Sequence, residues 1–158
     1  MGNGKQGLLG ALATGLVLAG THVSAGCDPA RAVVEGSFGS ASFQVAVADD
    51  PQERAQGLMN VPEMPTMSGM IFFYDQPQRA TFWMHNTMIP LDMLFIGADG
   101  VISSIHQEAV PYDKTVIDGG ADILSVLEIN GGMAARLGIA LGDRVKHPNF
   151  PTEVSGCP

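Results

Sequence analysis

Short apolar runs separated by turn-forming residues recur along the chain and constrain its fold more than any other feature. Residues 41–48 alternate between apolar and small or polar side chains, the period of a strand with one buried face. Residues 70–74 form a continuous apolar run, which is typical of a strand covered on both faces. So many short strands predict a mainly β fold, either a jelly-roll-like β-sandwich or a barrel. Further strands are predicted over residues 79–85, 123–129 and 142–146, with a hairpin over 92–107.

Two short helices are also predicted. Asp50, Pro51 and Glu53 supply an N-cap side chain, a proline at the first helical position and a glutamate at the third. We expect this helix to end at Gly57. Residues 133–137 predict one or two further helical turns, again ended by a glycine.

The dipeptide Asp99-Gly100 predicts a hairpin turn. Asp-Gly between two aliphatic runs favours a type I′ turn, whose twist matches that of two paired strands. With these two residues in the turn, Phe95 lies opposite Ser104, and Met93 lies opposite His106.

The amino-terminal residues have the pattern of a secretory signal peptide. Lys5 precedes an uncharged apolar run over residues 8–20, and small residues follow where a signal peptidase would cut. This run of 13 residues is shorter than the ~20 needed to span a bilayer as a helix. We expect cleavage after Ala25, with a retained anchor helix as the alternative. No later segment is long and apolar enough to span a membrane.

The expected domain organisation follows from this leader. Without residues 1–25 the chain is long enough for one hydrophobic core and too short for two. We expect a flexible segment over residues 26–40, a single β-rich domain over 41–147 and a carboxy-terminal tail over 148–158. The protein is then exported, to the periplasm or the outer envelope of a bacterial-type cell.

The two cysteines, Cys27 and Cys157, lie near opposite ends of the exported chain. An even number of cysteines in an oxidising compartment favours a disulfide, and we expect these two to be bonded to each other. The residues before Cys27 also match part of a lipid-attachment signal, so Cys27 could instead carry a lipid anchor. The two outcomes exclude each other.

The formal net charge of −8 argues against one class of partner. Only Lys5 is lost with the leader, which leaves 7 lysines and arginines against 16 aspartates and glutamates, a net charge of −9. An acidic surface repels phosphate groups. It therefore argues against nucleic acid and anionic lipid head groups as partners.

Unusual side chains are concentrated between residues 82 and 92, which makes this segment the natural place for a site. Trp83 is the only tryptophan, and it shares one face of the predicted strand with His85. Together with Asn86 and Asp92, these residues are candidates for binding a ligand. The alternative is that Trp83 is a core aromatic residue, His85 an exposed strand residue and Asn86 a turn former.

Asp92 and Glu128 are the two candidate acidic groups. The Asp92 carboxylate, at the start of the hairpin, could instead accept backbone N–H groups and fix the corner, and we favour this structural role. Glu128 shares a strand face with apolar residues, so its pKa should be raised unless a cation such as Arg136 or Arg144 pairs with it. Because strand ends are often exposed, we favour a solvated Glu128.

Met64, Met67 and Met70 are evenly spaced and indicate a second kind of site. In an exported protein such an array resembles the thioether sites that bind Cu(I), because soft sulfur ligands favour that ion. His85, Met88 and His106 could add ligands. The alternative is that these methionines fill gaps in the core or line a mobile loop, with no cofactor bound.

The common enzyme motifs are absent from the sequence. It contains no nucleophile elbow, no His-Glu-x-x-His, no phosphate-binding Walker loop and no dinucleotide-binding fingerprint. No catalytic residue is assigned, and an enzyme is not the favoured interpretation. A hydrolase or transferase built on Asp92, Glu128 and a histidine is the remaining catalytic alternative.

A series of ordered motifs resembles one known family, domain-of-unknown-function family 192. The resemblance runs from about Ser42 to Lys146 and implies a compact jelly-roll β-sandwich, frequently exported, with no established reaction. Its signature residues include Gly57, Leu58, Met59, Met84 and Pro90. This chain departs from the pattern at His85, where a lysine is usual, and in its methionine-rich loop. The motifs are Glu53-x-x-x-Gly57-Leu58-Met59, Gly69-Met70-Ile71-Phe72, Phe82-Trp83-Met84-x-Asn86-Thr87, Ile89-Pro90-Leu91-Asp92-x-x-Phe95, Leu127-Glu128 and Gly138-Ile139-x-x-Gly142-Asp143.

These observations favour an exported envelope binding or accessory domain that takes an unknown small molecule or envelope protein. The expected ligand site contains Trp83, His85, Asn86, Asp92 and Glu128. Cu(I) binding by the methionines and an uncharacterised hydrolase or transferase are the two alternatives.

Overall fold

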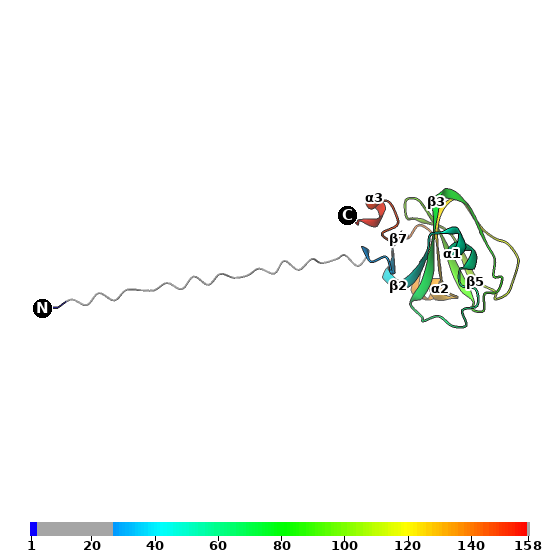
Figure 1. Cartoon of the computed structure of the whole chain (residues 1–158), viewed down its shortest axis with the longest axis horizontal. Coiled ribbons are helices and arrows are strands. Elements are labelled where there is room, and N and C mark those ends of the chain that lie inside the picture. Colours follow the sequence, from blue (N-terminus) through cyan, green and yellow to red (C-terminus); the bar gives the residue numbers. More distant parts are fainter. Residues whose placement is uncertain (3–26, 158) are drawn as a thin grey trace.

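The computed structural model describes residues 1–2 and 27–157 (Figure 1). The expected signal peptide over residues 1–25 therefore lies almost wholly outside the described residues. Within the described part of the chain, no helix is long and apolar enough to cross a membrane.

Seven strands form one curled sheet in the order β5-β4-β6-β3-β2-β1-β7 (Figure 1). Neighbouring strands are antiparallel except β2 and β3, which are parallel and are joined through α1. The predicted mainly β class is confirmed, and the single sheet forms a half-barrel where a sandwich would have two sheets. The elements are β1 (Arg31–Gly36), β2 (Gly39–Ala48), α1 (Pro51–Gln56), β3 (Ser68–Phe82), β4 (Leu91–Gly97), β5 (Ile102–Ala109), β6 (Ile117–Asn130), α2 (Met133–Leu137), β7 (Arg144–Lys146) and α3 (Thr152–Ser155).

The curl brings the two outer strands of the sheet, β5 and β7, together at one end. The N–H of Ile102 donates to the carbonyl of Asp143 at 2.9 Å, and the N–H of Val145 donates to that of Gly100 at 2.8 Å. An isolated bridge joins Val101 to Arg144. These contacts satisfy backbone groups that an open sheet would leave unpaired.

Each face of the sheet has its own hydrophobic cluster. One cluster draws on nearly every strand, includes Phe43 and Leu127, and is completed by α2 and Phe150. The other includes Phe72 and Phe95 and packs against residues that follow α1. The two strands at the middle of the sheet carry side chains of both clusters, so β4 and the second half of β6 are buried on both sides.

Two local predictions are confirmed. The Asp50 side chain accepts the N–H of Glu53 at 2.8 Å at the start of α1, and the helix ends at Gly57. In the β4–β5 hairpin, Phe95 pairs with Ser104 and Met93 pairs with His106, which is the predicted register. The predicted type I′ turn is wrong, because it needs a positive φ at both Asp99 and Gly100, and of the two only Gly100 has one, at 76°. The N–H of Gly97 donates to the carbonyl of Val101, and a register shift between Phe95 and Ile96 restores the expected pairs.

The expected flexibility of residues 26–40 is wrong for most of that segment. Residues 31–36 form β1, which pairs with β2 and with β7. Ala32 and Val34 alternate with more exposed residues and are 0% exposed, because β1 closes one side of the half-barrel. Their alternation is a strand pattern too short to stand out in the sequence.

Two further elements differ from the prediction. Residues 70–74 and 79–85 were expected as separate strands, but β3 runs unbroken from Ser68 to Phe82. Shifts of register between Phe73 and Gln78 accommodate Pro77, which can donate no ladder hydrogen bond. A third helix, α3, lies in the segment expected to be a tail.

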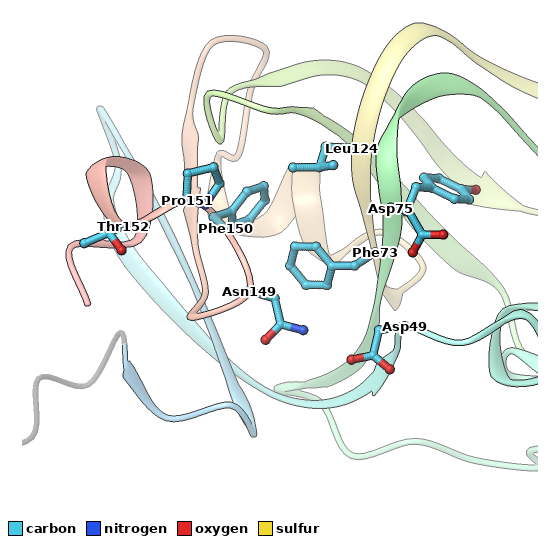
Figure 2. Close-up of a pocket in the computed structure, with 9 residues that line it drawn as sticks. Asp49, Phe73, Asp75, Leu124, Asn149, Phe150, Pro151 and Thr152 are labelled. Atoms are coloured by element: carbon cyan, nitrogen blue, oxygen red, sulfur yellow. The ribbon is translucent and has the colours of Figure 1, made fainter. Parts of the chain in front are cut away.

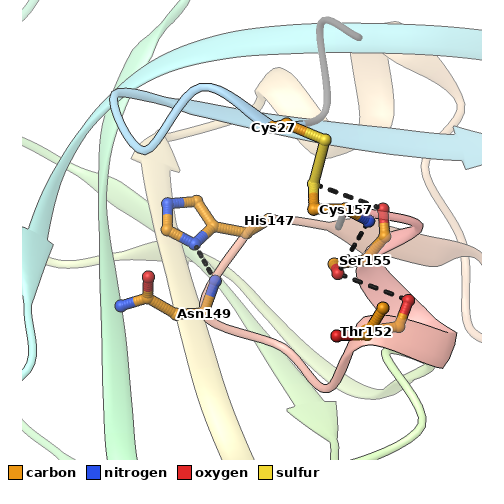
Figure 3. Close-up of a disulfide and its surroundings, with 6 residues drawn as sticks. All are labelled: Cys27, His147, Asn149, Thr152, Ser155 and Cys157. Atoms are coloured by element: carbon orange, nitrogen blue, oxygen red, sulfur yellow. Dashed lines mark hydrogen bonds between the residues drawn. A yellow bond between two sulfur atoms is a disulfide. The ribbon is translucent and has the colours of Figure 1, made fainter. Parts of the chain in front are cut away.

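The two ends of the described domain are joined through a disulfide and a buried histidine (Figure 3). Cys27 is bonded to Cys157, with Cα atoms 5.4 Å apart and a sequence separation of 130 residues. Beside them, Nδ1 of His147 accepts the N–H of Asn149 at 3.2 Å, while Nε2 lies 2.9 Å from the carbonyl of Pro29. Burial lowers the pKa of His147, so its ring is held neutral with the proton on Nε2.

Removing the disulfide should destabilise the protein without changing its fold. In the Cys27→Ser/Cys157→Ser variant we expect the free energy of unfolding to fall by up to about 4 kcal/mol, because the unfolded chain gains loop entropy. Urea unfolding followed by circular dichroism measures the change. Adding a reductant should weaken the wild type and leave the double variant unchanged. Equal midpoints for the oxidised and reduced wild type would contradict the expectation.

Candidate functional site

A small cavity lies where the end of α1 meets the sheet. Its volume is about 40 Å³, more than the ~10–15 Å³ that one water requires. We call it the Glu128 pocket, after the single carboxyl group in its wall. Its lining residues are Arg54, Ala55, Gln56, Gly57, Leu58, Met59, Phe72, Phe82, Trp83, Thr87 and Glu128.

Glu128 is buried in this pocket without a charged partner. It lies on β6 between Met70 of β3 and Met93 of β4, and is 4% exposed. Among the described residues, no hydrogen bond or ion pair to its carboxyl group is recorded. Burial alone raises the pKa of Glu128 to about 8, so the group is largely protonated at neutral pH. The favoured expectation of a solvated Glu128 is therefore wrong.

The two arginines considered as partners of Glu128 lie elsewhere. Arg144 donates to the carbonyl of Asp99 at 3.0 Å, and Arg136 is exposed on α2. Arg54 does line the pocket, but its guanidinium donates to the carbonyls of Asp49 and Phe73. None of the three arginines is close enough to lower the pKa of the carboxyl group.

Trp83 and His85 lie at the edge of the pocket. The Trp83 side chain is 51% exposed, and its ring centroid is 5.1 Å from that of His85, with the planes tilted by 40°. Nδ1 of His85 is buried and has no hydrogen-bond partner. Trp83 is thus not a core residue, and its exposed indole is suited to contact with a ligand.

The loop after β3 is fixed by backbone hydrogen bonds to two other loops. The N–H of Met84 donates to Asp113, and that of Asn60 donates to Asn86, both at 2.8 Å. Asn86 has a φ of 54°, a left-handed conformation that asparagine tolerates better than most residues. Asn86 therefore acts here through its backbone, and it holds the loop beside Trp83 in place.

Asp92 has a structural role on the opposite face of the sheet. Its carboxylate accepts three backbone N–H groups, from Glu108 at 2.8 Å, Gly132 at 2.9 Å and Ala134 at 2.8 Å. Asp92 precedes Met93 on β4, and neighbouring strand residues point to opposite faces. The structure thus separates Asp92 from the Glu128 pocket. It has the structural role favoured on sequence grounds.

The three evenly spaced methionines do not share one environment. Met64 and Met70 are partly buried against the cluster that contains Phe72, whereas Met67 is 37% exposed. Within the described ranges, no group of three or more His, Cys, Asp or Glu residues could hold a metal ion. Copper binding through thioether groups stays a prediction.

A larger hollow lies on another part of the surface (Figure 2). It has a volume of about 590 Å³ and lies between β3 and the segment leading to α3. Phe73 and Phe150 form its floor, and the carboxylates of Asp49 and Asp75 at its rim are exposed. No group there is buried without a partner, so we place the candidate site at the smaller Glu128 pocket.

Sequence reasoning missed Arg54 and Thr87, and only the family resemblance made residues 57–59 candidates for a shared site. The family motif names Gly57, Leu58 and Met59, but nothing in their spacing brings them to Glu128. Gly57 has a φ of 46°, and a Cβ there would lie 3.4 Å from the Phe72 ring. The glycine thus lets the chain turn close over the pocket.

Replacing Glu128 should change how stability depends on pH. The pKa of Glu128 is about 8 in the folded protein and near 4.5 in the unfolded chain, so the folded state holds the proton between these values. The contribution of Glu128 to the free energy of unfolding is therefore greatest below pH 4.5. It is lost as pH rises through 8, by at most about 5 kcal/mol. In Glu128→Gln this loss should disappear. Urea unfolding from pH 5 to pH 9 measures it.

The matched control for that experiment is Glu63→Gln, which changes an exposed glutamate. It should keep the wild-type loss of stability at alkaline pH. The burial of an unpaired acid would be contradicted if Glu128→Gln and Glu63→Gln gave the same pH profile.

Replacing Asp92 should destabilise the protein. Asp92→Ala leaves three backbone N–H groups without their acceptor, and we expect a loss of about 3 kcal/mol or more. Asp92→Asn retains one oxygen and should lose less. Thermal unfolding measures the order of stability of the two variants and the wild type. A fully stable Asp92→Ala variant would be inconsistent with the structural role.

Comparison with known proteins confirms the resemblance seen in the sequence. The model of the DUF192 family, described as Uncharacterized ACR, matches residues 32–147. A solved protein of unknown function from Novosphingobium aromaticivorans is 46% identical, with a TM-score of 0.72 over 73% of this chain and 83% of that chain. A "putative transcription regulator" from Sinorhizobium meliloti is 40% identical, with a TM-score of 0.72 over 73% and 91%. No curated protein matches. The chain belongs to domain-of-unknown-function family 192.

Proposed function

We propose that this protein is an exported binding domain of the cell envelope and that its ligand site is the Glu128 pocket. The observation that carries the proposal is the buried, unpartnered carboxyl group in the pocket wall. A buried polar group without a partner costs about 1–3 kcal/mol of stability. A ligand that supplies the missing partner recovers that cost, and the exposed Trp83 offers it an adjacent apolar surface.

The composition of the pocket favours binding over catalysis. Glu128 is the only carboxyl group among the lining residues, and no histidine or cysteine lies among them. The hydrolase or transferase alternative needs Asp92 beside Glu128, whereas Asp92 is bonded to three amides on the other face of the sheet. A single acid with an aromatic neighbour is sufficient for recognition.

The disulfide supports export to the periplasm or outer envelope. Disulfides persist in oxidising compartments and are rare in the cytosol. With Cys27 bonded to Cys157, the Cys27 sulfur is not free to carry a lipid, so the structure supports the disulfide alternative. The expected signal peptide over residues 1–25 directs the chain to export. The ligand is then a small molecule or a side chain of an envelope protein.

A ligand screen that reads the pocket directly tests this proposal. Because Trp83 is the only tryptophan, its fluorescence reports on the pocket edge without labelling. We expect some members of a fragment library to change this fluorescence and to shift the amide resonances of residues 57–59. Binding should weaken at least tenfold in Trp83→Ala, because the exposed contact surface is lost. The amide resonances measure binding in this variant, since it has no tryptophan.

Leu141→Ala is the matched control, since Leu141 is also an exposed apolar residue but does not line the pocket. It should bind as the wild type does. Fragments that bind only in the larger hollow around Phe73, or an absence of binding anywhere, would refute the site. Recovery of the intact chain from the cytosol with both thiols free would refute export.

A further inference from the structure

We infer that the Glu128 pocket binds a primary ammonium group at the end of an unbranched aliphatic chain. This inference rests on the proposed function and names the chemical class of its ligand. An alkyl diamine and a lysine side chain both present this chemistry.

The first argument is the missing counter-charge. Glu128 is 4% exposed, and no positive group among the described residues pairs with it. Arg54, the one cation in the pocket wall, is held by two backbone carbonyls and lies 5.6 Å from the centre of the Tyr74 ring. A ligand that brings its own positive charge would complete an ion pair that the chain itself does not make.

The second argument is the size of the cavity. A volume of about 40 Å³ is a few times the ~10–15 Å³ that one water requires, which is room for a small polar head group. An –NH₃⁺ group is similar in size to water, and its three N–H groups can donate to the Glu128 carboxylate and to nearby oxygens. A trimethylammonium group is larger and has no N–H group to donate to the carboxylate, and a guanidinium group is larger and planar.

The third argument is the character of the walls. Phe72, Phe82 and Trp83 line the pocket, and the Phe72 and Phe82 rings meet edge to face with centroids 5.2 Å apart. Aromatic rings attract a cation through their faces. Leu58 and Met59 supply aliphatic surface for the methylene groups that follow the ammonium. An acid beside aromatic and aliphatic side chains suits a charged tip on an apolar stem.

The charge of the whole chain acts in the same direction. The formal net charge is −8, and an acidic surface raises the local concentration of cations near it. An anionic ligand would be repelled by the acidic surface. Once ionised, the Glu128 carboxylate would also have no hydrogen to donate to such a ligand. A cationic ligand is therefore favoured both by the negative net charge of the protein and by the acidic side chain in the pocket.

A set of ligands of similar shape and different charge tests the inference on the full exported protein. We would titrate n-butylamine, 1-pentanol, pentanoate and tetramethylammonium, and follow Trp83 fluorescence and heat of binding at pH 7.5. We expect n-butylamine to bind at least tenfold more tightly than the other three. Cadaverine and an Nα-acetyl-lysine amide then distinguish a diamine from a lysine side chain as the source of the ammonium.

Two variants separate the charge of Glu128 from its shape. Glu128→Gln keeps the size of the side chain and should weaken n-butylamine binding at least tenfold, whereas the exposed control Glu63→Gln should have no effect. Circular dichroism of both variants verifies that they are folded.

Proton release on binding distinguishes a ligand-binding role of Glu128 from a purely structural one. An ammonium that enters the pocket displaces the proton of Glu128, so the heat of binding should depend on the ionisation enthalpy of the buffer in the wild type and not in Glu128→Gln. The other ionisable groups around the pocket are Arg54 of α1, Tyr74 of β3, and His85 against Trp83. Of these groups, Glu128 is the one carboxyl group that lines the pocket, and it is 4% exposed.

The outcomes distinguish this inference from the proposed function. If 1-pentanol or pentanoate binds the pocket as tightly as n-butylamine, the ammonium inference fails while the binding site stands. If none of the four ligands binds, the inference fails, and the fragment screen decides the proposed function by itself. Unchanged amine binding in Glu128→Gln also overturns the inference.

Discussion

The pairing of β6 with β3 on one side and β4 on the other is the constraint on which the rest of the structure depends. A strand in the middle of a curled sheet has neighbours on both edges, and here both faces are covered as well. A polar side chain within its buried run, residues 125–129, is removed from water. Glu128 is such a side chain, and its raised pKa follows directly from its position on this strand.

The same sheet gives its two candidate carboxyl groups opposite roles. Asp92 and Met93 are neighbours on β4, and Met93 is paired with Glu128. One carboxylate is turned towards backbone amides near α2, which hold it in place. The other is turned towards aromatic rings and finds no donor. Two acids with similar sequence surroundings thus become a structural anchor and a candidate binding group, because adjacent positions face different clusters.

Local signals in the sequence predicted local structure well. The cap at Asp50 depends on neighbouring residues alone and is found as expected, whereas the Asp-Gly dipeptide predicted the right strand pairing but the wrong turn type. The strand at residues 31–36 was missed because its partners, β2 and β7, decide its state. The burial of Glu128 was missed for the same reason, since the atoms that exclude water come from β3, β4 and α1. The family motifs indicated the important residues without showing which of them meet.

The position of the disulfide has a consequence for the order in which the molecule assembles. Its two cysteines are 130 residues apart, so the bond can form only once almost the whole chain has emerged from the ribosome or the export channel. β1 also pairs with β7, its second neighbour, which lies a similar distance away in the sequence. Contacts this distant in sequence slow folding, because a long loop must close before they are made. The disulfide therefore stabilises a sheet that is already in place and cannot guide the formation of that sheet.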